Sequence, residues 1–162
     1  MAISIIAAIG KNRELGRDNK LLWHIPEDMK RFKTLTNNSV VIMGRKTYES
    51  LPAKFRPLPN RENIIITRDK NYKQERAIIC FSMEEAIKKA QEFNKEVFVI
   101  GGAQIYNIGI KYADKLYLTL VDVEHLDADA FFPDYSEFKK IIVEKEGEKT
   151  NPKYRFVELI KG

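Results

Sequence analysis

The stretch EVFVIGGAQIY, residues 96–106, runs from an unbroken apolar segment through Gly101-Gly102 into a helical segment. An apolar run without polar interruption is typical of a strand that is covered on both faces. The stretch VVIMGRKTYES, residues 40–50, has the same order, with Gly44 between its apolar run and a short helix. Two such junctions indicate an α/β sheet of parallel strands, in which ligands bind beyond the carboxyl ends of the strands.

Outward from these junctions, apolar and β-branched runs recur along the chain. Together with 40–43 and 96–100 they make eight predicted strands, the others being 3–9, 63–67, 77–81, 116–121, 139–145 and 154–160. Four helical segments lie between them, at 26–36, after Gly44, at 82–93 and at 103–110. The third of these begins with Ser82 followed by Glu85, which is a capping box, and its apolar residues recur with the helical period.

The alternation of strands and helices ends near residue 121. We expect the last two runs to pair as antiparallel edge strands, with EGEKTNP, residues 146–152, as their turn region. We therefore predict one domain over residues 1–162. Its fold class is α/β, a three-layer αβα sandwich whose eight-stranded mixed, mainly parallel sheet has an antiparallel C-terminal edge strand and is covered by four helices.

Composition limits the classes of protein that fit this pattern. The chain has 162 residues, of which 44% are hydrophobic, and this suits a soluble domain with a sizeable core. No apolar run is long enough to span a bilayer, and the N-terminal apolar stretch lacks the marks of a signal peptide, so we expect a cytoplasmic protein. Cys80 is the one cysteine, and the two histidines, His24 and His125, lie far apart. We therefore expect neither an intrachain disulfide nor a metal site.

The net charge of +5 is compatible with nucleic acid as a partner and also with small anionic ligands. The basic residues are scattered among acidic ones, without the clustered basic and aromatic face of a nucleic-acid-binding module. Such a module remains the alternative from another class of protein, and salt-dependent binding to oligonucleotides would distinguish it.

Basic residues follow the apolar runs at three points. Arg45, Lys46 and Thr47 open the helix after Gly44, Gly101-Gly102 precede another helix, and Thr67-Arg68 end a third strand. A helix N-terminus binds anions through its free N–H groups and its dipole, and Arg or Lys adds charge-assisted contacts to phosphate. Each junction alone also fits a glycine turn with solvated side chains. Three of them on one edge of a sheet indicate a phosphorylated dinucleotide.

The segment WHIPEDMKRFK, residues 23–33, places an acid where a helix begins. Pro26 suits the first helical position, and acids are favoured in the first turn in any case. Asp28 differs from Glu27 because it shares a side of the helix with Phe32 and stands beside Met29. In an apolar cleft, desolvation would raise the pKa of Asp28, and an ionised Asp28 could accept two hydrogen bonds from an amidine-like edge of a heterocycle.

Arg61 follows the proline-rich loop RPLPN, residues 56–60, and precedes a strand. Its position is typical of a surface arginine, and it equally suits a guanidinium that binds a ligand carboxylate. The pattern of the sequence does not choose between the two.

Taken together these residues resemble dihydrofolate reductase, from Ser4 to about Ile160. The likeness rests on the order and spacing of several motifs: IAA at 6–8, LGRDNKLLWHIPEDMKRFK at 15–33, VIMGRKTYESLP at 41–52, RPLPNREN at 56–63, VIGGAQIY at 99–106, LYLT at 116–119 and FFPDY at 131–135. The family reduces 7,8-dihydrofolate to 5,6,7,8-tetrahydrofolate with NADPH. The resemblance implies that activity here, with antifolate inhibitors as further ligands, and a monomer that binds neither nucleic acid nor membrane.

By resemblance, Asp28 binds the pterin at ring N3 and the 2-amino group, and Thr119 joins that network. Hydride passes to pterin C6 and a proton reaches N5 from water, which leaves Asp28 an electrostatic and orienting role. Trp23 completes the catalytic group, and Arg61 clamps the glutamate α-carboxylate. The other residues implied in substrate binding are Ile6, Ala8, Met29, Phe32, Lys33, Leu51, Leu58, Ile100 and Tyr106.

The resemblance also implies a set of NADPH-binding residues. Those that flank the nicotinamide are Ala8, Leu15, Gly16, Asn19, Lys20 and Leu21. Those that hold the pyrophosphate region are Arg45, Lys46, Thr47, Gly102, Ala103, Gln104 and Ile105. Further cofactor-binding residues are Gly44, Ile100, Gly101 and Tyr106. Arg45, Thr67 and Arg68 are expected to bind the 2′-phosphate, and a cis bond is expected at Gly101–Gly102.

The chain departs from the family pattern at a few positions. Leu22 stands where the family usually has proline before Trp23, so an N–H is restored there. Asn60 replaces the usual glycine before Arg61, which a left-handed backbone would accommodate. Ala128-Asp129-Ala130 stands in place of Gly-Asp-Thr. A second enzyme, the reductase of riboflavin synthesis, looks similar in architecture, and Asp28 together with Arg61 distinguishes the two.

Overall fold

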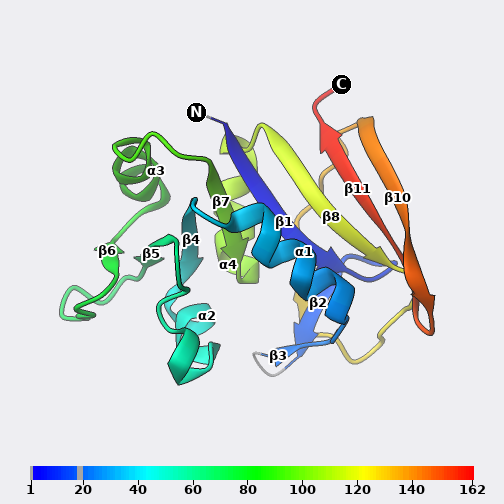
Figure 1. Ribbon diagram of the computed structural model, residues 1–162, viewed down its shortest axis with the longest axis horizontal. Coiled ribbons are helices and arrows are strands. Elements are labelled where there is room, and N and C mark those ends of the chain that lie inside the picture. The colour runs from blue at the N-terminus through cyan, green and yellow to red at the C-terminus, as the bar shows by residue number, and fades with distance from the viewer. Residues whose placement is uncertain (1, 18–19) are drawn as a thin grey trace.

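The computed structural model describes residues 2–17 and 20–162 (Figure 1). Within them lie eleven strands, namely β1 (Ile3–Ile9), β2 (Glu14–Arg17), β3 (Lys20–Leu21), β4 (Val40–Gly44), β5 (Glu62–Ile66), β6 (Ile78–Cys80), β7 (Val97–Gly101), β8 (Lys115–Val121), β9 (Ala130–Phe131), β10 (Lys140–Thr150) and β11 (Lys153–Ile160). The α-helices of this described part are α1 (Pro26–Thr36), α2 (Arg45–Ser50), α3 (Met83–Gln91) and α4 (Ala103–Gly109), and two 3-10 turns cover Ala53–Phe55 and Ile110–Tyr112.

Eight strands form one mixed sheet in the order β10-β11-β8-β1-β7-β4-β5-β6. The six strands from β8 to β6 are parallel, and β11 runs antiparallel to both of its neighbours. The predicted eight-stranded sheet and four helices are confirmed. The C-terminal strand β11 lies one place inside the edge, which β10 forms (Figure 1).

The turn between the last two strands is shorter than the sequence indicated. EGEKT belongs to β10, which continues to Thr150, and only Asn151 and Pro152 form the turn. Polar residues continue this strand because β10 is an edge strand whose side chains are almost all exposed. The expectation of a seven-residue turn region was therefore wrong.

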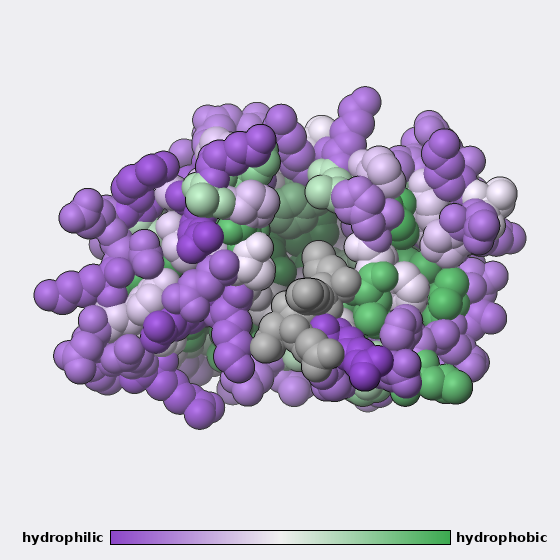
Figure 2. Space-filling model, turned by 90° about the horizontal axis from the view of Figure 1, so that it is seen from below, coloured by the Kyte–Doolittle hydropathy of each residue, from purple (hydrophilic) through white to green (hydrophobic). Residues whose placement is uncertain are grey.

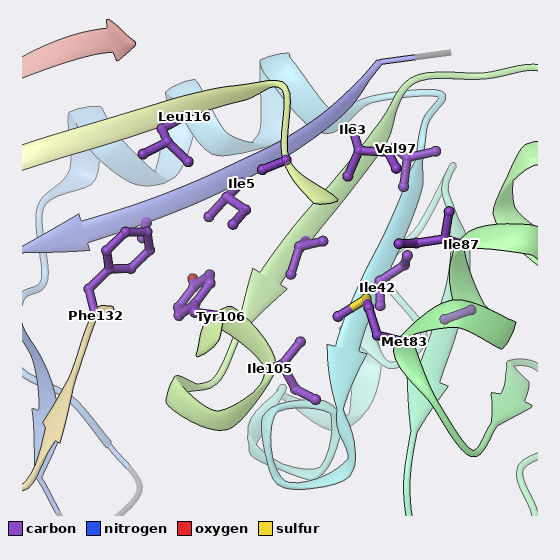
Figure 3. Packing of buried hydrophobic residues seen from close by; sticks show 14 of the residues in the cluster. Ile3, Ile5, Ile42, Met83, Ile87, Val97, Ile105, Tyr106, Leu116 and Phe132 are labelled. Atoms are coloured by element: carbon purple, nitrogen blue, oxygen red, sulfur yellow. The ribbon is translucent and has the colours of Figure 1, made fainter. Parts of the chain in front are cut away.

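Two hydrophobic clusters cover the two faces of the sheet, which explains the unbroken apolar runs. Alternate residues of a strand point to opposite faces. Val40 and Ile42 of β4 therefore join the cluster under α3 and α4, whereas Val41 and Met43 join the cluster under α1 and α2. Figure 3 shows the first cluster, where sheet residues such as Ile42 lie opposite side chains of α3 and α4. The three layers follow from this alternation.

Helix α3 begins where the capping box was predicted. The Ser82 hydroxyl accepts the Glu85 N–H at 3.1 Å, and the Glu85 carboxylate accepts the N–H of Phe81, one residue before the usual position, at 3.2 Å. The predicted apolar stripe is confirmed, since Met83, Ala86, Ile87 and Ala90 are all buried.

A small second sheet, in the order β3-β2-β9, was not predicted. Strand β2 pairs antiparallel with both neighbours, so the segment before α1 is joined to the segment after β8. Its strands have only two to four residues, which is too short for a periodic pattern to show. Of the helices that the structure describes, none is long and apolar enough to cross a membrane.

Candidate active site

The carboxyl ends of the parallel strands bring the predicted site residues together. Strand β1 lies between β8 and β7, so Ala8 pairs with Thr119, and in the neighbouring pair Met43 lies beside Gly101. Figure 2 looks onto these strand ends and shows a hollow with hydrophobic residues in its floor, between two lobes with hydrophilic surfaces. This is the edge at which an α/β sheet binds ligands.

Asp28 contacts Thr119 at this edge. Pro26 occupies the first turn of α1, as predicted, and Asp28 follows two residues later. The hydroxyl of Thr119, which is only 2% exposed, donates a hydrogen bond to Asp28 Oδ1. Burial raises the pKa of Asp28 above its usual value, while the Thr119 hydrogen bond and the positive charge of Arg31 oppose the rise. The predicted effect of desolvation on the Asp28 carboxyl is therefore present.

The neighbouring acid, Glu27, has a different environment. Its carboxylate accepts the Glu148 N–H at 2.9 Å and the Tyr154 hydroxyl at 2.5 Å, both from the β10–β11 hairpin. These two hydrogen bonds lower the pKa of Glu27. The two consecutive acids therefore have pKa values shifted in opposite directions, because hydrogen bonds dominate at Glu27 and desolvation dominates at Asp28.

Apolar residues surround this edge on the α1 side. Phe32, Leu51 and Ile100 pack against the cluster that contains the buried residues Ile6 and Leu58. Two residues of the predicted set do not belong to this buried surface. Met29 is 55% exposed and Lys33 is also exposed, so their contact with substrate stays a prediction.

Tyr106 connects two of the central strands. Its hydroxyl lies 2.8 Å from the carbonyl oxygen of Ile6 and 2.9 Å from that of Ile100, and its donated hydrogen serves these acceptors. Burial raises the pKa of the Tyr106 phenol, so the hydroxyl stays a neutral donor at physiological pH. Tyr106 thus fixes the strand ends on which Asp28 and the paired glycines converge.

Trp23 precedes α1 and packs against a third cluster, which contains Ile25 and Val121 at the carboxyl end of β8. Its indole packs edge-on against the ring of His125, with the ring centroids 6.4 Å apart. Within residues 2–17 and 20–162, the buried Trp23 Nε1 finds no hydrogen-bond partner, and neither does Nδ1 of His125. A buried donor without a partner is costly, so the Trp23 N–H is suited to a ligand or a water bound to it. The sequence pattern did not point to His125, because its contact with Trp23 spans about a hundred positions.

The two glycine junctions lie side by side, as the parallel strands predicted. A Cβ at Gly44 would lie 3.0 Å from Ile105 Cγ1 of α4, and one at Gly102 would lie 3.5 Å from Thr47 Oγ1 of α2. Gly101 has a φ of +122°, and the Gly101–Gly102 bond is cis, as expected. No described side chain caps α2 or α4, so the first N–H groups of two adjacent helices are available to phosphate.

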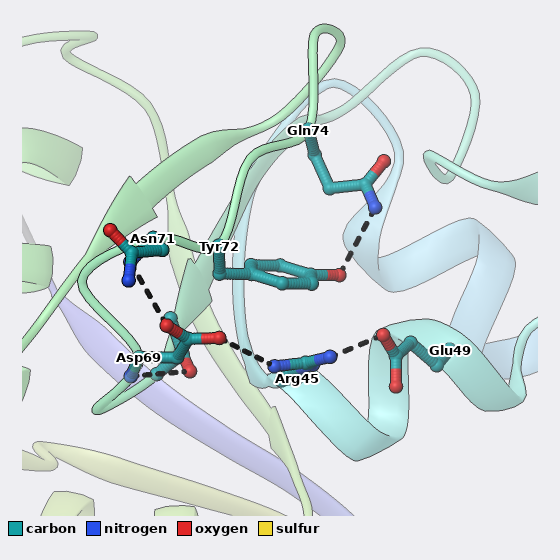
Figure 4. Close-up of polar contacts among 7 residues, drawn as sticks. Arg45, Glu49, Asp69, Asn71, Tyr72 and Gln74 are labelled. Atoms are coloured by element: carbon teal, nitrogen blue, oxygen red, sulfur yellow. Dashed lines mark hydrogen bonds and ion pairs between the residues drawn. The ribbon is translucent and has the colours of Figure 1, made fainter.

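Arg45 stands at the first junction in a network of charges and an aromatic ring. Its guanidinium contacts Glu49 at 3.1 Å and Asp69 at 3.2 Å, and it stacks on Tyr72 with 4.2 Å to the ring centroid (Figure 4). The hydrogen bond to Glu49 is the main cause of a raised Arg45 pKa. Thr67 Oγ1 accepts the Asp69 N–H at 3.2 Å, so the third predicted anion element lies beside the first. Lys46 and Arg68 are exposed at this edge.

The side chain of Arg61 contacts the C-terminal end of α1. Its Nε donates to the carbonyl of Pro59 at 2.9 Å, and its Nη1 donates to Thr36 Oγ1 at 3.0 Å. Partial burial lowers the pKa of this guanidinium. From Asp28 to Thr36 the helix rises about 12 Å, so a ligand that contacts both Asp28 and Arg61 must be elongated. Asn60 has a φ of 60°, which is the left-handed conformation that its position required.

Backbone hydrogen bonds hold Leu15, Gly16 and Leu22. Leu22 donates its N–H, which a proline would lack, to the Leu15 carbonyl at 3.4 Å, and Asp129 donates its N–H to the Gly16 carbonyl at 3.0 Å. The Ala128-Asp129-Ala130 stretch thus keeps its contact with Gly16 through the main chain. Lys20 and Leu21 form β3 opposite Arg17 and Gly16. Asn19 lies outside the described residues, so its predicted contact stays a prediction.

A partly buried carboxylate beside two glycine junctions with uncapped helix N-termini is the arrangement expected of a nucleotide-dependent α/β enzyme. The described part of the chain holds no group of three His, Cys, Asp or Glu side chains arranged for a metal ion. A family model described as dihydrofolate reductase matches residues 2–161. The chain belongs to the dihydrofolate reductase family, and its activity is the NADPH-dependent reduction of dihydrofolate.

Individual relatives agree with this assignment. The dihydrofolate reductase of Buchnera aphidicola subsp. Acyrthosiphon pisum is 49% identical over 135 residues, which cover 83% of this chain and 81% of the relative. That of Bacillus subtilis is 39% identical over 148 residues, covering 91% and 85%. The solved structure of dihydrofolate reductase from Enterococcus faecalis, complexed with NADP(H) and RAB-propyl, matches with a TM-score of 0.87 and 28% identity over 99% of this chain and 96% of that one.

Proposed function

We propose that Asp28 binds and orients the pterin of 7,8-dihydrofolate while hydride is added at C6 and a proton at N5. The observation that carries this proposal is the partly buried Asp28 carboxyl, held by Thr119 at the carboxyl edge of the sheet. With one oxygen fixed by the Thr119 hydroxyl, the carboxylate presents its remaining acceptor positions to the N3–H and 2-amino group of the pterin.

Asp28 acts electrostatically on the reaction. The negative charge of this partly buried carboxylate stabilises the positive charge that develops when N5 is protonated. The proton itself comes from water, because Asp28 contacts the pyrimidine side of the ring and N5 lies on the other side. The Trp23 N–H, which is buried and unpartnered among the described residues, is suited to hold a water at this edge.

The residues at the glycine junctions fit NADPH. When bound, NADPH supplies the hydride from its nicotinamide C4. The N–H groups at the starts of α2 and α4 and the hydroxyl of Thr47 hold the pyrophosphate region, where a side chain at Gly44 would meet Ile105. Arg45, Thr67 and Arg68 bind the 2′-phosphate. Leu15 and Gly16 flank the nicotinamide from β2.

Arg61 binds the α-carboxylate of the folate glutamate. Its two contacts to Pro59 and Thr36 hold the guanidinium in place and leave its other N–H groups for a bidentate pair. The roughly 12 Å between the two ends of α1 matches an elongated substrate. The same pterin site accounts for binding of antifolate inhibitors that carry an amidine edge. In this proposal the enzyme is cytoplasmic and acts as a monomer.

The decisive experiment follows the loss of NADPH absorbance when dihydrofolate is added. The parent should turn over, and Asp28→Asn should bind NADPH normally but lose activity at neutral pH by on the order of a hundredfold. Glu27→Gln is the matched control, because it alters the preceding acid, whose contacts lie on the β10–β11 hairpin. A folded parent without turnover contradicts the proposal, and so does an Asp28→Asn variant as active as the parent.

A further inference from the structure

Glu14 of β2 is a carboxylate that is only 1% exposed. Its Oε1 accepts the N–H of Asn12 at 2.6 Å, and its Oε2 accepts the N–H of His125 at 2.7 Å. Glu14 and His125 lie 111 positions apart. One buried carboxylate therefore closes the turn before β2 and holds the loop that follows β8.

The turn before β2 is shaped around this carboxylate. Gly10 donates its N–H to the Glu14 carbonyl and accepts the Arg13 N–H, both at 3.1 Å, and Arg13 has a φ of 65°. A Cβ at Gly10 would lie 2.5 Å from Glu14 Oε1 and 2.8 Å from the Val123 carbonyl. Only glycine leaves room for the Glu14 side chain at this point.

Glu14 connects two segments that adjoin the proposed active site, one through the chain and the other through its carboxylate. On one side, Leu15 and Gly16 follow Glu14 directly in β2, and Gly16 accepts the Asp129 N–H at 3.0 Å. On the other side, the ring of His125 packs against Trp23, at 6.4 Å between centroids. One buried carboxylate thus links the start of β2 to the loop that carries His125.

The Glu14 contacts are those of an ionised carboxylate. Burial alone would raise its pKa, but the N–H groups of His125 and Asn12 outweigh that effect and leave the pKa lowered. Hydrogen bonds to a charged acceptor are stronger than neutral ones, and an amide side chain cannot accept at both of its ends.

We propose that Glu14 is a positioning residue for the reaction, because it fixes Leu15–Gly16 on the nicotinamide side and, through His125, Trp23 on the pterin side. The inference rests on the proposed function for the roles of these segments. It goes beyond that function because Glu14 itself contacts neither ligand and acts through the segments that do.

Glu14→Gln tests the proposal, because it keeps the shape and places an NH2 group against a backbone N–H. We expect NADPH to bind about tenfold more weakly, because part of its binding energy must then restore the position of Leu15–Gly16. Trp23 is the only tryptophan of the chain, so its fluorescence reports on this position alone, and its emission should shift to longer wavelength as it meets water. The emission is recorded without ligands.

Asp114→Asn is the matched control. Its carboxylate also accepts a backbone N–H from 111 positions away, that of Ile3 at 2.9 Å, but at the amino end of β1. It should lose thermal stability while Trp23 emission and NADPH affinity stay at the parent values. If Glu14→Gln loses only stability, as this control does, the positioning role is wrong.

Gly10→Ala is a second, independent variant, since its methyl group displaces the Glu14 carboxylate without removing it. It should reproduce the emission shift and the weaker NADPH binding, and a parent-like protein would contradict the proposal. It also decides the question should Glu14→Gln fail to fold. If the parent itself shows no turnover, the proposed function fails, whereas the emission shift still tests the link from Glu14 to Trp23.

Discussion

Thr119 of β8 donates its hydroxyl hydrogen to Asp28 of α1, across 91 positions of the sequence. Thr119 is held in the sheet between Ala8 of β1 and Phe156 of β11, so the hydrogen bond has a rigid donor. Asp28 stands in the first turn of the helix that crosses this face of the sheet. The pair therefore joins two layers of the fold at the edge where we propose that the pterin binds, and it keeps a carboxyl in a place where burial disfavours its charge.

The first prediction concerns the stability cost of this carboxyl. Because the pKa of Asp28 is raised on folding, the folded state binds more protons than the unfolded state once pH exceeds the unfolded value, 3.8. The free energy of unfolding then falls as pH rises through the raised pKa, and the penalty is complete above it. Asp28→Asn should therefore be more stable than the parent at neutral pH, with the gain vanishing in acid. Urea denaturation at a series of pH values measures this.

Glu27→Gln should behave in the opposite way, because the pKa of Glu27 is lowered by Glu148 and Tyr154. Its carboxylate contributes stability above the unfolded pKa of 4.5, and the contribution is lost as pH falls through the lower folded value. Glu27→Gln should thus cost stability at neutral pH and nothing in strong acid. Equal signs for the two variants would contradict this account of the two acids.

The second prediction concerns the glutamate end of the substrate, as distinct from its pterin end. Arg61→Ala removes the proposed partner of the glutamate carboxylate, so dihydrofolate should bind roughly tenfold to hundredfold more weakly, as expected for a charge-assisted pair. An antifolate without a glutamate should bind nearly as it does to the parent. Equilibrium titration of both ligands checks this. Arg61→Lys should recover only part of the loss, since a lysine cannot form the bidentate fork.

The third prediction concerns the contact between the two glycine junctions. In Gly44→Ala the added methyl would lie 3.0 Å from Ile105 Cγ1, and overpacking of this kind costs about 1–3 kcal/mol of unfolding free energy. The affinity for NADPH should fall as well, because Ile105 lies in the first turn of α4, whose N–H groups we propose to bind the pyrophosphate. Gly109→Ala is the control, since the nearest atom to its methyl, at 3.2 Å, is the flexible end of Met83. A larger loss for Gly109→Ala would refute the packing argument.

The main sheet could be predicted from the sequence because both of its faces are covered. Val40–Gly44 and Val97–Gly101 are apolar throughout, and each ends at a glycine before a helix, so type and direction follow from the pattern. The small sheet of β2, β3 and β9 could not be predicted, since its two- to four-residue strands are too short to show a period. The full length of β10 was missed because an exposed edge strand has no apolar face.

Some residues of the candidate site could likewise be predicted from the sequence, whereas others could not. Asp28 was found through helical spacing from Phe32, and the anion-binding edge through glycine after an apolar strand. Glu14 left no sign in the sequence, since a single acid beside a turn is ordinary and its partner His125 lies 111 positions away. The roles of Thr119, Tyr106 and Trp23 came from the family resemblance, because nothing local marks a strand threonine that will face a distant carboxylate.

The last prediction concerns the choice between NADPH and NADH. Arg45 is held by Glu49 and Asp69 and stacks on Tyr72, so its guanidinium is already in place at the edge where we put the 2′-phosphate. Arg45→Gln should weaken NADPH binding about tenfold while leaving NADH nearly unchanged, since only the former loses a charge-assisted pair. Titration of both cofactors at low and high salt measures these effects, and the Arg45 contribution should shrink as salt screens it. An equal loss for NADH and NADPH in Arg45→Gln would show that Arg45 does not bind the 2′-phosphate.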